Sequence, residues 1–131
     1  EPYLVTFEEY LDDILGVSQR RLLQAEGRII IEPLEFCRGR TFKDCYFILD
    51  EGANCTFDTL KMILTRVGTN CRLLINGDPN QSDLNGKYKS GLLDVFNKLK
   101  DVEGIGLVEL GREDILRSGL IGKILERLEN V

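Results

Sequence analysis

The chain has 131 residues, of which 43% are hydrophobic and 30% charged, with a formal net charge of −5 and a pI near 4.8. This length suits a single compact core, and no apolar run approaches the ~18 residues of a membrane span. The acidic balance argues against a broad nucleic-acid-binding face. No stretch at the amino terminus has the form of a signal peptide. We therefore expect a cytoplasmic protein with no membrane segment.

The cysteines argue against a metal centre. Cys37, Cys45, Cys55 and Cys71 show no Cys-x-x-Cys spacing, and histidine is absent. Structural zinc sites are built from closely spaced Cys and His ligands, so a zinc site is not expected. Buried thiols in a reducing compartment are the favoured interpretation.

The amino-terminal part of the chain is predicted to be helical. Thr6 is a suitable helix cap, and Glu9 three residues later completes a capping box for a helix over 6–15. A second helix is predicted over 18–25, with Arg20 on its polar face. These two helices form a helical segment within residues 1–27.

The remainder of the chain alternates between apolar runs of strand length and helical patterns. Strands are predicted over 28–32, 45–49, 72–76 and 105–110, and helices over 56–67, 90–99 and 118–128. Alternation of this kind is typical of a parallel sheet with helices on its faces. We therefore expect one α/β domain spanning 1–131, with its sheet core in 28–131.

Two carboxylates follow the strand over 45–49. In open parallel sheets, ligands bind at the carboxyl ends of the strands, where Asp50 would hold a magnesium–water shell and Glu51 would accept a proton from an attacking water. The alternative is a buried strand followed by a helix amino terminus, where acidic residues are favoured by the helix dipole. The segment alone supports both interpretations about equally.

The strand over 72–76 has a similar ending. It runs into Gly77-Asp78-Pro79-Asn80-Gln81, where glycine and proline favour a turn. The amide of Gln81 can donate to a γ-phosphate and accept from an attacking water. A plain turn is the alternative, but the pairing with Asp50 and Glu51 favours a functional role.

Several strings together resemble the PhoH-like family of ATPases. These are Gly39-Arg40-Thr41-Phe42, Leu49-Asp50-Glu51, Leu60-Lys61-Met62-Ile63-Leu64-Thr65-Arg66-Val67-Gly68, Gly77-Asp78-Pro79-Asn80-Gln81-Ser82-Asp83-Leu84, Lys89-Ser90-Gly91-Leu92 and Asp101-Val102-Glu103-Gly104-Ile105. The resemblance covers nearly the whole chain. It implies a P-loop NTPase-like, three-layer α/β/α fold related to superfamily-one helicases. It also implies ATP and Mg²⁺ as cofactors and a role in phosphate starvation or RNA metabolism.

The resemblance also implies site residues beyond the strand ends. Arg117 matches the arginine of the family's Arg-His-Pro string, and it would stabilise charge on the γ-phosphoryl group. An ion pair with a neighbouring acidic residue is the alternative. Asp78, Arg40 and Thr41 are predicted to contact the nucleotide, and for Arg40 a solvated loop is the alternative.

A P-loop string, Gly-x-x-x-x-Gly-Lys-Ser/Thr, does not occur in the sequence, since Gly86-Lys87 is followed by Tyr88. In the family this string lies upstream. We therefore expect the chain to be the carboxyl-terminal half of a longer ATPase, a partial domain that does not hold ATP tightly alone.

Two departures from the family pattern weaken the case for turnover. Gly52-Ala53 stands where the family has Ala-Gln, and Arg117-Ser118-Gly119 replaces Arg-His-Pro. The alternative function is therefore a non-catalytic interaction or assembly module that kept the sheet. The resemblance leaves room for RNA or single-stranded nucleic acid as a partner and for a homo-oligomer.

Overall fold

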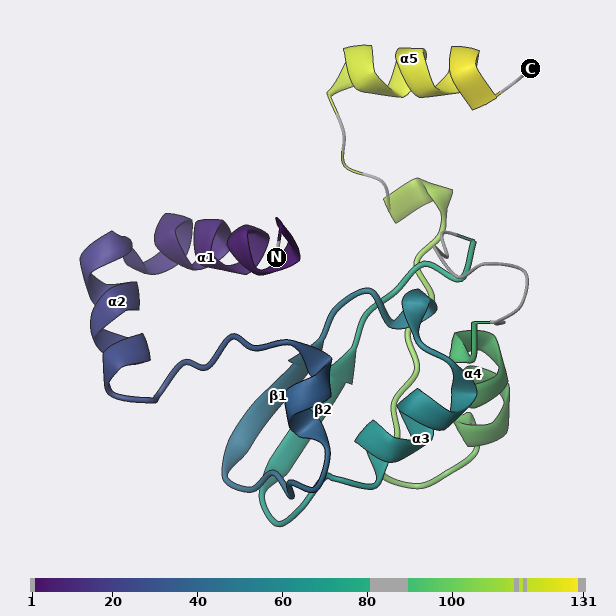
Figure 1. Ribbon diagram of the computed structural model, residues 1–131. Coiled ribbons are helices and arrows are strands. Elements are labelled where there is room, and N and C mark those ends of the chain that lie inside the picture. The colour runs from purple at the N-terminus through teal and green to yellow at the C-terminus, as the bar shows by residue number, and fades with distance from the viewer. Residues whose placement is uncertain (1, 81–89, 115, 117, 130–131) are drawn as a thin grey trace. The chain divides into compact units, whose positions relative to one another are not determined.

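The computed structural model describes residues 2–80, 90–114, 116 and 118–129. Their contacts divide the chain into two compact units, Glu1–Leu93 and Asp94–Val131. Figure 1 shows the helices α1 (Pro2–Leu15), α2 (Val17–Ala25), α3 (Phe57–Leu64), α4 (Leu92–Leu99) and α5 (Gly119–Glu129), and the strands β1 (Cys45–Leu49) and β2 (Cys71–Ile75). Short 3-10 turns lie at Leu34–Cys37, Gly52–Asn54 and Arg112–Asp114. None of the helices in these described ranges is long and apolar enough to cross a membrane.

The strands β1 and β2 pair in parallel, which confirms the predicted α/β class. Their register runs from Cys45 opposite Cys71 to Leu49 opposite Ile75. A parallel pair needs a crossover connection, and α3 provides it. The helix begins where predicted, because the Thr56 hydroxyl accepts a hydrogen bond from the Thr59 amide at 3.3 Å.

The core of the first unit contains one face of α3 and one face of the sheet. Leu60 and Ile63 of α3 are fully buried, and Leu49 at the end of β1 is also buried. The other face of the sheet carries Tyr46 and Ile48, whose side chains are 71% and 61% exposed. Sheets of parallel strands are normally covered on both faces. The outer face of this sheet therefore exposes apolar side chains that parallel strands usually bury.

Two predicted strands are absent from the described residues. Residues 28–32 run as irregular chain toward the turn at Leu34–Cys37, and residues 105–110 are also irregular. An isolated strand gains little without a neighbour to share its backbone hydrogen bonds. In the described residues the sheet has two strands, and neither segment pairs with it.

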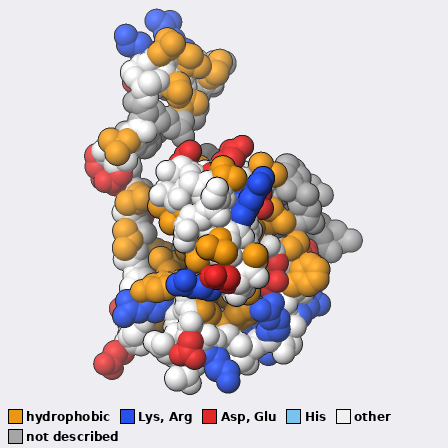
Figure 2. All heavy atoms as spheres, turned by 90° about the vertical axis from the view of Figure 1, so that its left-hand side faces the viewer, with side chains coloured by type: hydrophobic (Ala, Val, Ile, Leu, Met, Phe, Trp, Pro, Cys, Tyr) orange, Lys and Arg blue, Asp and Glu red, His pale blue; other side chains and the backbone are white. Residues whose placement is uncertain are grey.

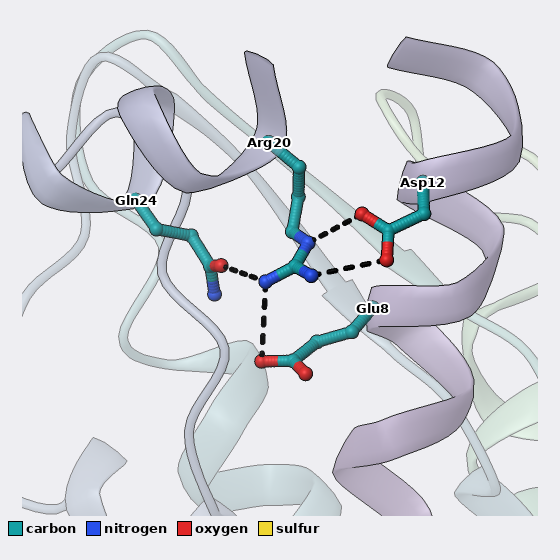
Figure 3. Close-up of polar contacts among 4 residues, drawn as sticks. All are labelled: Glu8, Asp12, Arg20 and Gln24. Carbon is teal, nitrogen blue, oxygen red and sulfur yellow. Dashed lines mark hydrogen bonds and ion pairs between the residues drawn. The ribbon is translucent and has the colours of Figure 1, made fainter. Parts of the chain in front are cut away.

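The helices α1 and α2 form a hairpin that is held together by a buried arginine, Arg20. The sequence predicts Arg20 on the polar face of a helix, but this prediction is wrong, because the residue is only 9% exposed. Figure 3 shows its guanidinium group between the two helices, where it donates to both carboxylate oxygens of Asp12 (2.6 and 3.0 Å) and to Gln24 (2.9 Å). Glu8 lies 3.8 Å away. The guanidinium fork suits this bidentate contact.

The predicted capping box at Thr6 was wrong, since α1 already begins at Pro2. Proline is favoured in the first turn of a helix, where backbone amide groups have no hydrogen-bond partner within the helix. The amide hydrogen that proline lacks would therefore go unused there. The helix therefore starts one turn before the position that the Thr6 and Glu9 spacing suggested.

Candidate functional site at the carboxyl ends of β1 and β2

The carboxyl ends of β1 and β2 are joined through Asp50 and Asn76. The side-chain amide of Asn76 donates to Oδ1 of Asp50 at 2.9 Å, and its backbone amide donates to the carbonyl of Leu49 at 2.9 Å. The Asn76 carbonyl in turn accepts from the Gly52 amide at 2.8 Å. The in-register ladder thus continues one residue beyond each strand and fixes the position of the Asp50 carboxylate.

Glu51 follows with an unusual backbone. Its φ of 56° and ψ of 39° place it in the left-handed region, which costs a non-glycine residue about 1–2 kcal/mol. The conformation turns the chain from β1 into the 3-10 turn at Gly52–Asn54 and leaves the Glu51 side chain exposed. Backbone strain of this kind is common at functional sites.

The turn after Glu51 packs directly on the end of β2. A Cβ atom at Gly77 would lie 2.8 Å from the Ala53 nitrogen and 3.0 Å from the Gly52 nitrogen, and one at Gly52 would lie 2.8 Å from Cγ2 of Ile75. Ala53 is completely buried. Glycine at both positions therefore permits the close backbone approach that holds the two strand ends together.

The departure from the family pattern at Gly52-Ala53 thus has a structural meaning. Ala53 is fully buried, so the larger side chain of a glutamine at this position would have to fit inside the packed turn. In this protein the turn packs the two strand ends together.

Asp78 lies in the turn after β2, where its carboxylate accepts a hydrogen bond from the Asn80 amide at 2.9 Å. This Asx-type contact stabilises the turn, and Asp78 is exposed beside it. Gln81 and Arg117, both predicted to act at the site, lie outside the described residues. Their roles therefore stay predictions.

Arg40 and Thr41 lie at the other end of β1. They precede its first residue, and five strand residues span about 16 Å, so the structure does not bring them together with Asp50 and Glu51. The Arg40 guanidinium group forms an ion pair with Glu32 and lies 4.9 Å from the ring centre of Phe42. These contacts give Arg40 a structural role, and its predicted contact with a nucleotide stays a prediction.

Arg40 and Thr41 also line a hollow of about 900 Å³. Its lining is largely apolar and includes Phe7 of α1, Ile30 and Phe47. The residues at the carboxyl ends of the strands are not among those that line it. The hollow is therefore separate from the candidate site.

The strand-end site offers few protein ligands for a cation. In the described part of the chain, no group of three or more Asp, Glu, Cys or His side chains gathers around one point. Mg²⁺ in nucleotide sites is commonly bound by one or two carboxylates, with water and substrate phosphates completing its shell. Asp50, with one oxygen held by Asn76, fits the protein's share of such a shell.

The family model described as "PhoH-like protein" matches residues 1–129. The chain belongs to the PhoH-like protein family. The family assignment therefore rests on a match over almost the whole sequence.

Individual relatives show the same similarity. The chain is 42% identical over 126 residues to a PhoH-like protein of Bacillus subtilis, covering 96% of this chain and 40% of the relative. It is 39% identical over 126 residues to Protein PhoH of Escherichia coli, covering 95% and 36%. A PhoH-like protein of Synechocystis is 36% identical over 129 residues, covering 98% and 39%. The chain thus spans about two fifths of the length of these relatives.

Proposed function

We propose that this chain supplies the magnesium-binding and water-activating part of a PhoH-like ATPase. The observation that carries the proposal is the Asp50–Asn76 hydrogen bond, which fixes one carboxylate at the ends of two parallel strands, with exposed Glu51 beside it. Parallel sheets bind ligands at this edge. Membership of the PhoH-like family supports the same interpretation of the site.

In this proposal each residue has one task. Asp50 would hold Mg²⁺ through water molecules of its shell, and the bound ion would supply positive charge beside the phosphates. Glu51 accepts the proton of the water that attacks the γ-phosphorus. Asn76 holds Asp50 in place through its side-chain amide.

Further residues complete the proposed site. Gln81 orients the attacking water and contacts the γ-phosphate, Asp78 contributes to nucleotide binding, and Arg117 stabilises charge on the transferring group. The P-loop that would cradle the phosphates belongs to an upstream segment, as the family resemblance implies. A P-loop NTPase fold, a link to RNA metabolism or phosphate starvation, and a cytoplasmic location are parts of the same proposal.

The open outer face of the sheet supports the idea that this chain works as one part of a larger unit. Tyr46, Ile48 and Leu74 expose 71%, 61% and 50% of their surfaces on neighbouring strands. Figure 2 shows further hydrophobic side chains reaching the surface among charged ones. We propose that the remaining PhoH-like polypeptide, about three fifths of the relatives' length, covers the outer face of the sheet.

The experiment compares two proteins. One is the chain as it stands, and the other, called here the extended protein, carries the unmatched segment of the Bacillus subtilis relative at its amino end. Mg²⁺-dependent ATP hydrolysis is measured for both, with and without RNA. The proposal expects turnover in the extended protein and little in the chain alone.

The same open face favours a second function, a non-catalytic assembly module that binds the rest of a PhoH-like polypeptide through Tyr46, Ile48 and Leu74. A folded extended protein that neither binds nor hydrolyses ATP would favour this module over the ATPase. Stimulation by RNA would identify RNA as a partner.

A further inference from the structure

The first residues of the two strands are both cysteines. Cys45 and Cys71 are partners in the strand register, so their side chains lie on the same face of the sheet. Their sulfur atoms are 3.7 Å apart, which is close enough for a hydrogen bond between the two thiols. Both residues are partly exposed, whereas Cys37 and Cys55 are 4% and 7% exposed.

The backbone geometry permits a covalent bond between these thiols. Neighbouring strands lie about 4.8 Å apart, which falls within the Cα separation of about 4.4–6.8 Å seen in disulfides. The sulfurs would have to approach from 3.7 Å to about 2.05 Å. Rotation about the side-chain bonds of Cys45 and Cys71 supplies this movement without changing the strand register.

We propose that Cys45 and Cys71 are a modification site, a dithiol that a hydroperoxide oxidises to a cross-strand disulfide. In the first step the Cys45 thiolate attacks the terminal peroxide oxygen, the O–O bond breaks, and Cys45 becomes a sulfenic acid as the departing hydroxide or alkoxide takes up a proton. In the second step the Cys71 sulfur attacks the Cys45 sulfur. The S–S bond forms, the S–O bond breaks, and the thiol proton leaves with the hydroxide as water.

The surroundings assign the two roles. Cys45 lines a hollow of about 210 Å³ together with Asp44, Tyr46, Asn70 and Arg72, which gives a small oxidant a place to approach. Burial raises the pKa of the Cys71 thiol, and the contact with Cys45 raises it further. Cys45 is therefore the attacking thiol and Cys71 the resolving one.

The disulfide would form at the opposite end of the strand pair from the candidate site, and its expected effect is on stability. Cys45 and Cys71 open the same two strands whose carboxyl ends hold Asp50 and Asn76. A bond at the amino ends restricts the separation of the strands in the unfolded chain and so favours the folded state. Oxidation is therefore expected to raise the thermal unfolding midpoint of the chain.

The test uses the chain itself with hydrogen peroxide as oxidant. Fully reduced protein is treated, unreacted thiols are blocked, and nonreduced peptides are identified by mass spectrometry. We expect a peptide linked through Cys45 and Cys71 that dithiothreitol separates. The Cys37→Ser/Cys55→Ser variant is the matched control and should form the same link, and fragmentation of the unsubstituted protein gives the same information if that variant does not fold.

Single variants test the assigned roles. Cys71→Ser should lose the link and accumulate a sulfenic acid at Cys45, which dimedone traps. Cys45→Ser should lose the link and trap much less dimedone at Cys71. Linkage through Cys37 or Cys55, or oxidation to sulfinic acid with no Cys45–Cys71 link in the reduced, folded protein, would overturn the proposal.

Discussion

The side-chain amide of Asn76 donates a 2.9 Å hydrogen bond to the carboxylate of Asp50, and this bond joins the carboxyl ends of β1 and β2. A second bond of the same chemistry lies at the amino ends, where Asn70 donates to Asp44 at 3.0 Å. The two Asn–Asp bonds thus bracket the strand pair. Only the first of them adjoins Glu51.

Asn76→Ala should lower the free energy of unfolding by about 0.5–1.5 kcal/mol, because it removes one hydrogen bond and leaves the Asp50 oxygen without its donor. In the extended protein it should also raise the Mg²⁺ concentration needed for ATP hydrolysis, since Asp50 is no longer held in place. Chemical denaturation and a Mg²⁺ titration of turnover measure the two effects.

The matched control is Asn70→Gly. Asn70 has a φ of 54°, so glycine removes its side chain without adding backbone strain. A smaller loss of stability is expected than for Asn76→Ala, because relief of the left-handed strain at Asn70 partly offsets the lost hydrogen bond. The Mg²⁺ requirement should be unchanged. If both variants changed the Mg²⁺ requirement equally, Asn76 would have no special role at the site.

Glu51→Gly should increase the free energy of unfolding while abolishing turnover. Glycine relieves about 1–2 kcal/mol of left-handed strain and costs about 0.5–1 kcal/mol through its flexible unfolded state, for a net gain of up to about 1.5 kcal/mol. Glu51→Ala keeps the strain and should lose turnover without that gain. Denaturation midpoints compare the two variants, and a Glu51→Gly protein less stable than Glu51→Ala would refute the strain argument.

Gly77→Ala should destabilise the first unit by about 1–3 kcal/mol, because the added methyl group would press on backbone that cannot move aside cheaply. The nearest atoms are backbone nitrogens at 2.8 and 3.0 Å. Gly106→Ala is the control, since a Cβ there meets nothing within 4 Å. Equal denaturation midpoints for the two variants would show that the strand ends are not closely packed.

The α1–α2 hairpin should weaken in acid. The hydrogen bond from Arg20 lowers the pKa of Asp12 below its ordinary value. The stabilisation is therefore complete above the unfolded-state pKa of Asp12 and is lost as pH falls through the lower folded-state pKa. Helical circular dichroism and thermal midpoints recorded from neutral pH to about pH 3 follow this loss.

Asp12→Asn should remove this part of the acid sensitivity and lower the thermal midpoint at neutral pH. The exposed neighbour Asp13 provides the control variant, Asp13→Asn. An unchanged acid profile in Asp12→Asn would mean that the Arg20 contact adds no pH-dependent stability.

Local patterns predicted the centre of the first unit well. The apolar run before Asp50, the Thr56 cap and the spacing of Leu60 and Ile63 gave β1, α3 and the parallel pairing with β2, and the structure confirms all three. Each of these signals acts within one element or between neighbours. The two carboxylates were likewise correctly placed at a strand end.

Interactions between distant residues were not predictable in the same way. The apolar segments over 28–32 and 105–110 have strand composition, but a strand also needs a partner, which composition does not reveal. The sequence around Arg20 does not distinguish it from a surface arginine, because its partner Asp12 lies on the other helix of the hairpin. The sequence places Asn76 at the end of a predicted strand. Its contact with Asp50 depends on the register between β1 and β2, which the sequence does not reveal.

The role of Glu51 as general base is tested most directly by the turnover number of Glu51→Gln in the extended protein, with Glu35→Gln, at an exposed position, as the matched control. Glutamine keeps the size of the side chain but cannot accept the proton of the attacking water. We predict that Glu51→Gln lowers ATP turnover about 10²- to 10⁴-fold, while ATP binding by this variant and turnover by Glu35→Gln stay unchanged. Full turnover in a folded Glu51→Gln protein would contradict this prediction.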